Sequence, residues 1–172
     1  FGADPVTLQG TSNSGLAIKY EVVEGPAKMI DGKLVSTSAG IVKLKASQVG
    51  NDNYAAAEKT FEVLISKGNQ KITWTDIPAK TFGDGSFVVN ASTSSGLGVT
   101  YEVASGQAKI EGSKVTLTGG GTVVLKAIQT GNGNWHSAAE LKTVEVSKAK
   151  QTISYGYMAG RKFTTDPIKL GA

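Results

Sequence analysis

The sequence predicts an all-β protein built from tandem β-sandwich domains, and two observations carry this prediction. The first is an internal repeat: a shift of 81 residues aligns the sequence with itself, with 22 identical residues and no gap over positions 1–54. Self-similarity at a fixed period indicates a repeat architecture. The second is the alternation of apolar and polar residues over short stretches bounded by turn residues, which is typical of half-buried strands.

The repeat predicts where the domains begin and end. Motifs recur in order over the first 54 residues, and small insertions or deletions are expected near Ala55 and Leu64. A third copy then starts, because Gln70–Trp74 matches Gln151–Tyr155. We expect a first repeat over residues 1–66 that lacks its first strand and a complete repeat over 67–148. The first strand and start of a third repeat are expected over 149–172. Because the chain opens with Phe1 rather than Met, we expect it to be cut from a longer protein.

Each repeat divides into about seven short strands. In the complete repeat the expected strands carry inward-facing sets of apolar residues, namely Ile72 and Trp74; Phe87 and Val89; Val99, Tyr101 and Val103; Ile110 and Val115; Val123, Leu125 and Ala127; and Val144 and Val146. Asp31-Gly32 predicts a two-residue hairpin, because a type I′ turn needs positive φ at both central positions. Seven strands in roughly 80 residues indicate a two-sheet Greek-key sandwich of immunoglobulin-like architecture.

A string of motifs also resembles a known family. It comprises Gln-x-Ile-x-aromatic, Phe-Gly-Asp, Ser-Ser-Gly-Leu-x-Val-x-Tyr, Gly-x-Ala-x-Ile, Gly-x-Val-x-Leu-x-Ala and Gln-x-Gly-Asn-x-Asn-aromatic. This order resembles bacterial immunoglobulin-like repeats of large surface and secreted proteins, including adhesins. The resemblance implies an extracellular or cell-surface parent protein, repeats that serve as spacers or adhesive stalks, and no catalytic residues.

Composition narrows the classes of function. The longest apolar runs are only a few residues, so no segment predicts a membrane span. The net charge of +4 comes from scattered Lys and Arg side chains, whereas nucleic-acid binders concentrate them in a stripe. There is no cysteine, which is compatible with a secreted protein that folds without disulfides. We expect neither a nucleic acid nor a membrane as partner.

The most distinctive candidate site is the Gly-Asn-x-Asn-aromatic segment, which occurs as Gly50–Tyr54 and Gly131–Trp135. In a binding interpretation, Asn132, Asn134 and Trp135 would contact a sugar ring or a host protein. In a structural interpretation, Gly and Asn adopt the left-handed backbone of a tight turn and the aromatic side chain folds back to plug the end of its own sandwich. Recurrence in both repeats favours the structural interpretation.

Other candidate chemistries have little support. His136 is the single histidine, and the other repeat has Ala55 at that position, so we expect an exposed side chain without a catalytic role. Glu21 and Glu102 occupy equivalent places in separate repeats, too far apart for glycoside hydrolysis. Calcium would need several oxygen ligands, but Asp52 has Gly133 as its counterpart. We predict no enzymatic activity, cofactor or metal.

The leading functional prediction is a structural spacer or stalk module of a bacterial cell-surface or secreted multi-repeat protein, and we expect this parent protein to be an adhesin. The alternative is an adhesive module that binds carbohydrate or a host protein. The expected partners are neighbouring repeats of the same chain and, in the alternative, a surface glycan or protein. The first repeat lacks its first strand and Lys150–Tyr157 is a spare one, so we further expect strand exchange between molecules, because exposed sheet edges recruit strands.

Overall fold

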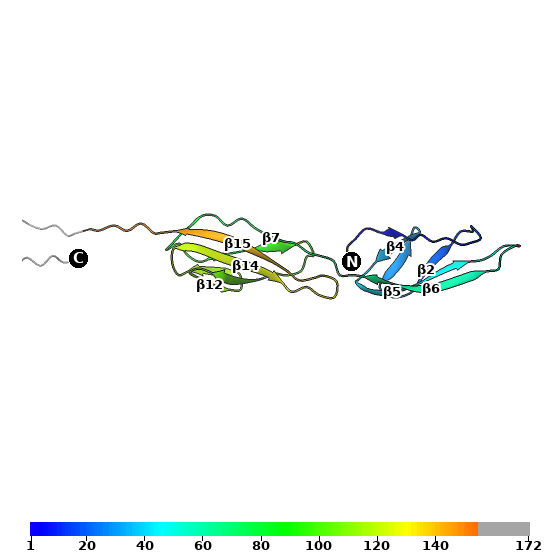
Figure 1. The fold of residues 1–172 in the computed structure, drawn as a ribbon. Coiled ribbons are helices and arrows are strands. Elements are labelled where there is room, and N and C mark those ends of the chain that lie inside the picture. Colours follow the sequence, from blue (N-terminus) through cyan, green and yellow to red (C-terminus); the bar gives the residue numbers. More distant parts are fainter. Residues whose placement is uncertain (155–172) are drawn as a thin grey trace, which may run out of the picture.

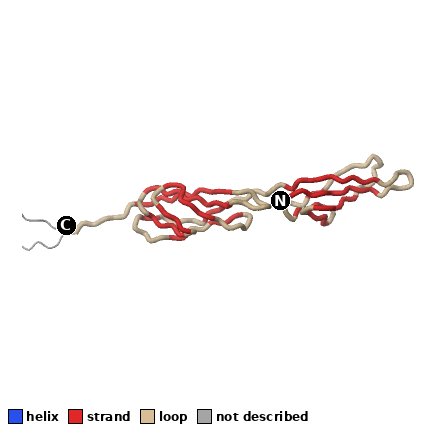
Figure 2. The backbone as a smooth tube through the Cα atoms, turned by 90° about the horizontal axis from the view of Figure 1, so that it is seen from below, coloured by secondary structure: helices blue, strands red, loops and turns tan. Residues whose placement is uncertain are grey.

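The computed structural model describes residues 1–154, and within this range the chain is all-β, without a helix. No described segment is therefore a helix of the length and apolarity that a membrane crossing requires. The strands form two groups that lie end to end (Figures 1 and 2). Each group has its own hydrophobic core, and residues 66–71 connect them.

The N-terminal group comprises two three-stranded sheets. One sheet has the order β1 (Val6–Thr7), β4 (Lys33–Ser36), β3 (Ala27–Ile30), and the other β2 (Lys19–Glu24), β5 (Gly40–Gln48), β6 (Ala57–Ile65). The core lies between them and combines Ala27 and Leu34 of the first sheet with Val42 and Leu44 of the second. The alternation of β5 explains this placement: Val42 and Leu44 are fully buried, whereas Lys43 between them is exposed.

The C-terminal group is built in a related way with more strands. A four-stranded sheet has the order β11 (Thr100–Ser105), β14 (Gly121–Gln129), β15 (Ala138–Ser147), β8 (Lys80–Thr81). A three-stranded sheet contains β12 (Ala108–Glu111), β13 (Lys114–Leu117) and β9 (Phe87–Val88), and a two-stranded sheet pairs β10 (Ala91–Thr93) with β7 (Ile72–Trp74). The buried core combines Val115 of the three-stranded sheet and Val89, which follows β9, with four residues of the four-stranded sheet, namely Val123, Leu125, Val144 and Val146.

The predicted strand faces are confirmed at the centre of both groups. Val123, Leu125 and Ala127 of β14 are at most 2% exposed, as their inward assignment requires. The hairpin at Asp31-Gly32 is also confirmed, because φ is 48° and 74° at these residues and Ile30 pairs with Lys33. The described residues form six strands in the N-terminal group and nine in the C-terminal group, compared with about seven expected in each.

The predicted insertions near Ala55 and Leu64 are wrong. β5 pairs with β6 from Gly40↔Ile65 to Gln48↔Ala57, and β14 pairs with β15 from Gly121↔Val146 to Gln129↔Ala138. These pairs differ by 81 residues at both ends of the ladder, so no residue has been gained or lost between them. The two repeats are less similar in sequence here only because residues are substituted. Phe61 and Lys142, for example, occupy the same place in the two ladders.

Leu125 is expected to be essential for the stability of the C-terminal group. It is fully buried in the core, so Leu125→Ala should lower the free energy of unfolding by about 2–5 kcal/mol. Leu141→Ala is the matched control, because Leu141 is 57% exposed and should change it by less than about 0.5 kcal/mol. Urea denaturation followed by tryptophan fluorescence measures both. Equal losses in the two variants would contradict this assignment of the core.

Two cross-strand ion pairs lie on the solvent face at equivalent places. The Lys45 Nζ is 2.6 Å from the Glu21 Oε1, and the Lys126 Nζ is 2.9 Å from the Glu102 Oε1. The hydrogen bond from Lys45 and its charge lower the pKa of Glu21 below its ordinary value of 4.5. The same bond and the charge of Glu21 raise the pKa of Lys45 above 10.5.

Glu21 is therefore expected to make stability dependent on acid pH. Because its pKa is lower in the folded chain, its stabilising contribution is present above pH 4.5 and is lost as the pH falls through the lowered value. Glu21→Gln should reduce the loss of stability between neutral pH and pH below 4.5, by a small amount because the pair is exposed. Urea midpoints at several pH values measure this, with Glu111→Gln as a control outside these pairs. An unchanged acid dependence in Glu21→Gln would count against the pair.

Candidate functional site: the loop Gly131–His136

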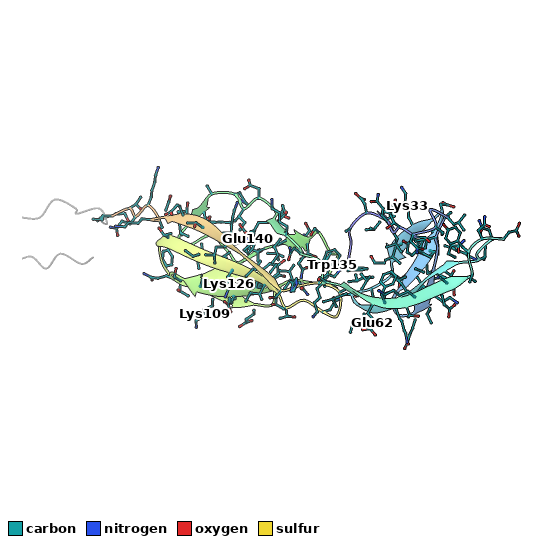
Figure 3. The ribbon with its side chains drawn as sticks, turned by 45° about the vertical axis from the view of Figure 1, so that its right-hand side comes forward. Lys33, Glu62, Lys109, Lys126, Trp135 and Glu140 are labelled. Atoms are coloured by element: carbon teal, nitrogen blue, oxygen red, sulfur yellow. The ribbon has the colours of Figure 1, made fainter. Side chains whose placement is uncertain are left out.

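The candidate site lies where the two groups of strands meet. The loop Gly131–His136 connects β14 to β15 at the end of the C-terminal group that faces the N-terminal group. Figure 3 shows Trp135 between the two groups. The link of residues 66–71 passes the same place, and an isolated bridge pairs Gly68 with Trp135 in parallel orientation.

The loop is held in a tight turn by Asn132. Its Oδ1 accepts hydrogen bonds from the backbone amides of Asn134 and Trp135, at 2.8 and 2.9 Å, and its own amide donates to the Trp135 carbonyl at 3.0 Å. Gly131 has φ of 80°, a conformation that side chains disfavour. The predicted left-handed backbone is therefore confirmed at Gly131 but is wrong for the asparagines, because Asp31 is the only non-glycine residue with a positive φ among those that the structure describes. Asn132 shapes the turn through its side-chain hydrogen bonds instead. In the loop of the N-terminal group, Asn51 makes the equivalent two bonds, both 3.0 Å.

Trp135 packs across the junction. Its ring meets that of Phe1 edge to face, with centroids 5.4 Å apart at 77°. A Cβ placed on Gly68 would lie 2.7 Å from the Trp135 Cζ3, and one on Gly2 3.1 Å from the Cη2, so the indole occupies space that only glycines leave open. The expectation that this side chain plugs the end of its own sandwich is wrong. The ring packs instead against Phe1 and Gly2 of the N-terminal group and against Gly68 of the link.

Polar groups of the loop bind the link and the segment between β4 and β5 of the N-terminal group. The Gly68 amide donates to the Asn134 carbonyl at 2.8 Å, and the His136 amide donates to the Gly68 carbonyl at 2.9 Å. The Lys67 Nζ donates to the Asn132 carbonyl at 2.7 Å, and the Ala39 amide donates to the Asn134 Oδ1 at 2.9 Å. The structure thus brings Asn132, Asn134 and Trp135 together, and all three have partners within the chain.

Sequence reasoning missed the residues that receive this loop: Phe1, Gly2, Ala39, Lys67 and Gly68. The structure shows that φ at Gly68 is not positive, so its missing side chain reflects a close contact and not a turn, but the sequence shows only a glycine there. The contact itself joins positions more than 60 residues apart, and no local periodicity relates them. The partners therefore required the structure.

The remaining titratable candidates do not converge. The His136 side chain is exposed, and its backbone supplies the contacts noted above together with a carbonyl that accepts a bond of 2.6 Å from the Gln70 Nε2. Glu21 and Glu102 belong to different groups of strands, each paired with a lysine. Across residues 1–154, no three His, Asp or Glu side chains gather in the way that metal ligands do.

Compared with models of known protein families and with curated proteins, the sequence matches none.

Trp135 is expected to fix the orientation of the two groups. Trp135→Ala removes the edge-to-face contact, which contributes about 0.5–1.5 kcal/mol beyond the buried area, so the groups should bend more freely. Solution scattering at high dilution should then give a broader distance distribution and a shorter maximum dimension. Tyr54→Ala is the matched control, because Tyr54 is 46% exposed in the equivalent loop at the outer end of the N-terminal group. An unchanged maximum dimension in Trp135→Ala would show that the hydrogen bonds of the junction fix the orientation of the two groups without the aromatic contact.

Proposed function

We propose that the chain consists of tandem immunoglobulin-like β-sandwich domains that act as a structural spacer or stalk. The domains span residues 1–66 and 67–148 in this proposal, and a third begins at 149, most of it outside the described residues. The support is the recurrence of strand pairing at the 81-residue offset, with separate cores in the two groups. Even the bulges recur, between Val22 and Glu24 and between Val103 and Ser105.

The observation that carries the spacer function is the engaged junction. The link of residues 66–71 is short, and Gly68 is bound on both its amide and its carbonyl by the loop of the following group. A flexible string of domains needs a linker that is free of its neighbours, and here the linker is part of the contact. Domains joined in this way keep a fixed direction, which suits a module that holds another part of a protein away from a surface.

The placement of this rod in a bacterial cell-surface or secreted protein rests on the motif string described above. An adhesive module that binds carbohydrate or host protein is the alternative. It would need Asn132, Asn134 and Trp135 to offer free polar groups and an open ring face. Their engagement with Lys67, Ala39 and Phe1 favours the spacer.

A binding screen tests the spacer proposal. The folded chain, applied to arrays of glycans and extracellular-matrix proteins, should give no saturable binding, and Trp135→Ala should behave in the same way. Saturable binding that Trp135→Ala abolishes, while Tyr54→Ala retains it, would replace the spacer by an adhesive site at this loop. Circular dichroism of each variant confirms that its strands are intact.

A further inference from the structure

The N-terminal group carries an open groove of about 560 Å³ beside its second sheet. One wall is the segment of residues 8–13, with Gly10 and Thr11 at its middle, and the other wall is the start of β6 at Ala57 and Lys59. Tyr20 and Phe61 also line it. The groove is thus bounded by backbone on two sides and by aromatic rings, which is the environment of a missing β-strand.

The C-terminal group shows what belongs in this place. There β7 lies against β10, with Ile72 opposite Thr93 and Trp74 opposite Ala91. β7 also approaches β15, because the Trp74 Nε1 donates to the Glu140 carbonyl at 3.3 Å. Ile72 is 3% exposed, and the Trp74 ring packs 5.5 Å from that of Tyr101.

The groove retains the backbone groups that would form hydrogen bonds with such a strand. Beyond the β7–β10 ladder, the Thr75 amide donates to the Asn90 carbonyl and the Ser94 amide donates to the Lys71 carbonyl, both at 2.9 Å. The counterparts of Asn90 and Ser94 are Gln9 and Asn13 on the groove wall. Within the part of the chain that the structure describes, no backbone hydrogen bond engages the Gln9 carbonyl or the Asn13 amide.

The described residues also end in a segment with the sequence of such a strand. Residues 151–154 read Gln-Thr-Ile-Ser and are followed in sequence by Tyr155, which matches the Gln-Lys-Ile-Thr-Trp of residues 70–74. All four described residues are exposed, Ile153 by 86%. This segment leaves the end of the rod that is opposite to the groove, so it is remote from the groove of its own molecule (Figure 1).

We propose that the groove binds the segment beginning at Gln151 of a second copy of this chain, with Ile153 taking the place that Ile72 has in the C-terminal group. The inference rests on the proposed domain arrangement and adds an intermolecular partner to it. Paired strands give the affinity through main-chain hydrogen bonds, and the buried side chains give the specificity.

The outer ends of the two groups of strands carry residues equivalent to those of the internal junction. One end presents counterparts of Phe1, Gly2, Lys67 and Gln70, and the other presents counterparts of Gln129, Asn132 and Asn134; in chain order these are Gln48, Asn51, Asn53, Phe82, Gly83, Lys148 and Gln151. Two large apolar side chains are exposed at these ends, Phe82 by 43% and Tyr54 by 46%. A second copy would cover both.

Two substitutions distinguish this contact from the internal junction. A Cβ on Gly68 would lie 2.7 Å from the Phe1 carbonyl oxygen and 2.7 Å from the Cζ3 in the six-membered ring of Trp135. The counterpart of Gly68, Ala149, does carry a methyl group, and the residue it would face is Tyr54, whose single ring is smaller than an indole. A glycine against a tryptophan is thus replaced by an alanine against a tyrosine. Because each contact joins different surfaces, association continues head to tail and does not close into a dimer.

Sedimentation velocity over a range of concentrations tests the association. The wild-type chain should form head-to-tail oligomers that grow with concentration, and Ile153→Asp should remain monomeric, because it places a charge at a buried position. Thr152→Asp is the control with the same change of charge, and it should associate as the wild type does, since the corresponding Lys71 is exposed. A monomeric wild-type chain, or equal association of both variants, would overturn the proposal.

Binding of a peptide tests whether the groove is the site of this intermolecular contact. A fluorescent peptide of residues 149–157 should bind the monomeric Ile153→Asp chain and shift the amide resonances of Gly10, Thr11 and Ala57. The same peptide with Ile153→Asp should not bind. Shifts elsewhere, or binding of both peptides, would contradict the groove as the site. A chain that stays monomeric and straight in solution scattering would overturn this inference alone, and a chain that bends freely would overturn the spacer proposal.

Discussion

The extended arrangement of this chain depends on the missing side chain at Gly68. At that one residue the link between the two groups approaches an indole closely enough that a methyl group would have no room. The close approach in turn lets the Gly68 amide and carbonyl pair with Asn134 and His136, as two neighbouring strands would. A short link thereby becomes a strand-like contact, and the direction of one group follows from that of the other.

Interior strands and local turns could be predicted from the sequence because their cause is local. Alternation along β14 defines a buried face, and Asp31-Gly32 can adopt the two positive φ angles of a tight hairpin. The position of Trp135 could not be predicted, because an aromatic residue in a loop packs against whichever apolar surface is nearest. Here Phe1 supplies that surface, and nothing in the local sequence of the loop indicates it.

The Gly-Asn-x-Asn-aromatic motif of the candidate site occurs in two loops that have different surroundings. Asn51 and Asn132 shape their loops with the same side-chain bonds to the backbone. The loops differ in what lies beyond them: Trp135 meets Phe1, whereas Tyr54 faces solvent. The same hydrogen-bonded turn therefore packs against another group of strands at one place and is exposed at the other. The surroundings of each loop, and not its own sequence motif, cause this difference.

The pairing of β14 with β15 also has a mechanical consequence. The chain enters the C-terminal group at the junction and leaves it from β15 at the opposite end, so tension applied along the rod pulls β15 along its own length (Figure 1). Nine residue pairs join β15 to β14, from Gly121↔Val146 to Gln129↔Ala138, and β8 pairs with its last residues. A pull in this direction loads these hydrogen bonds together as shear instead of opening them one after another, which is the geometry of a tether that resists extension.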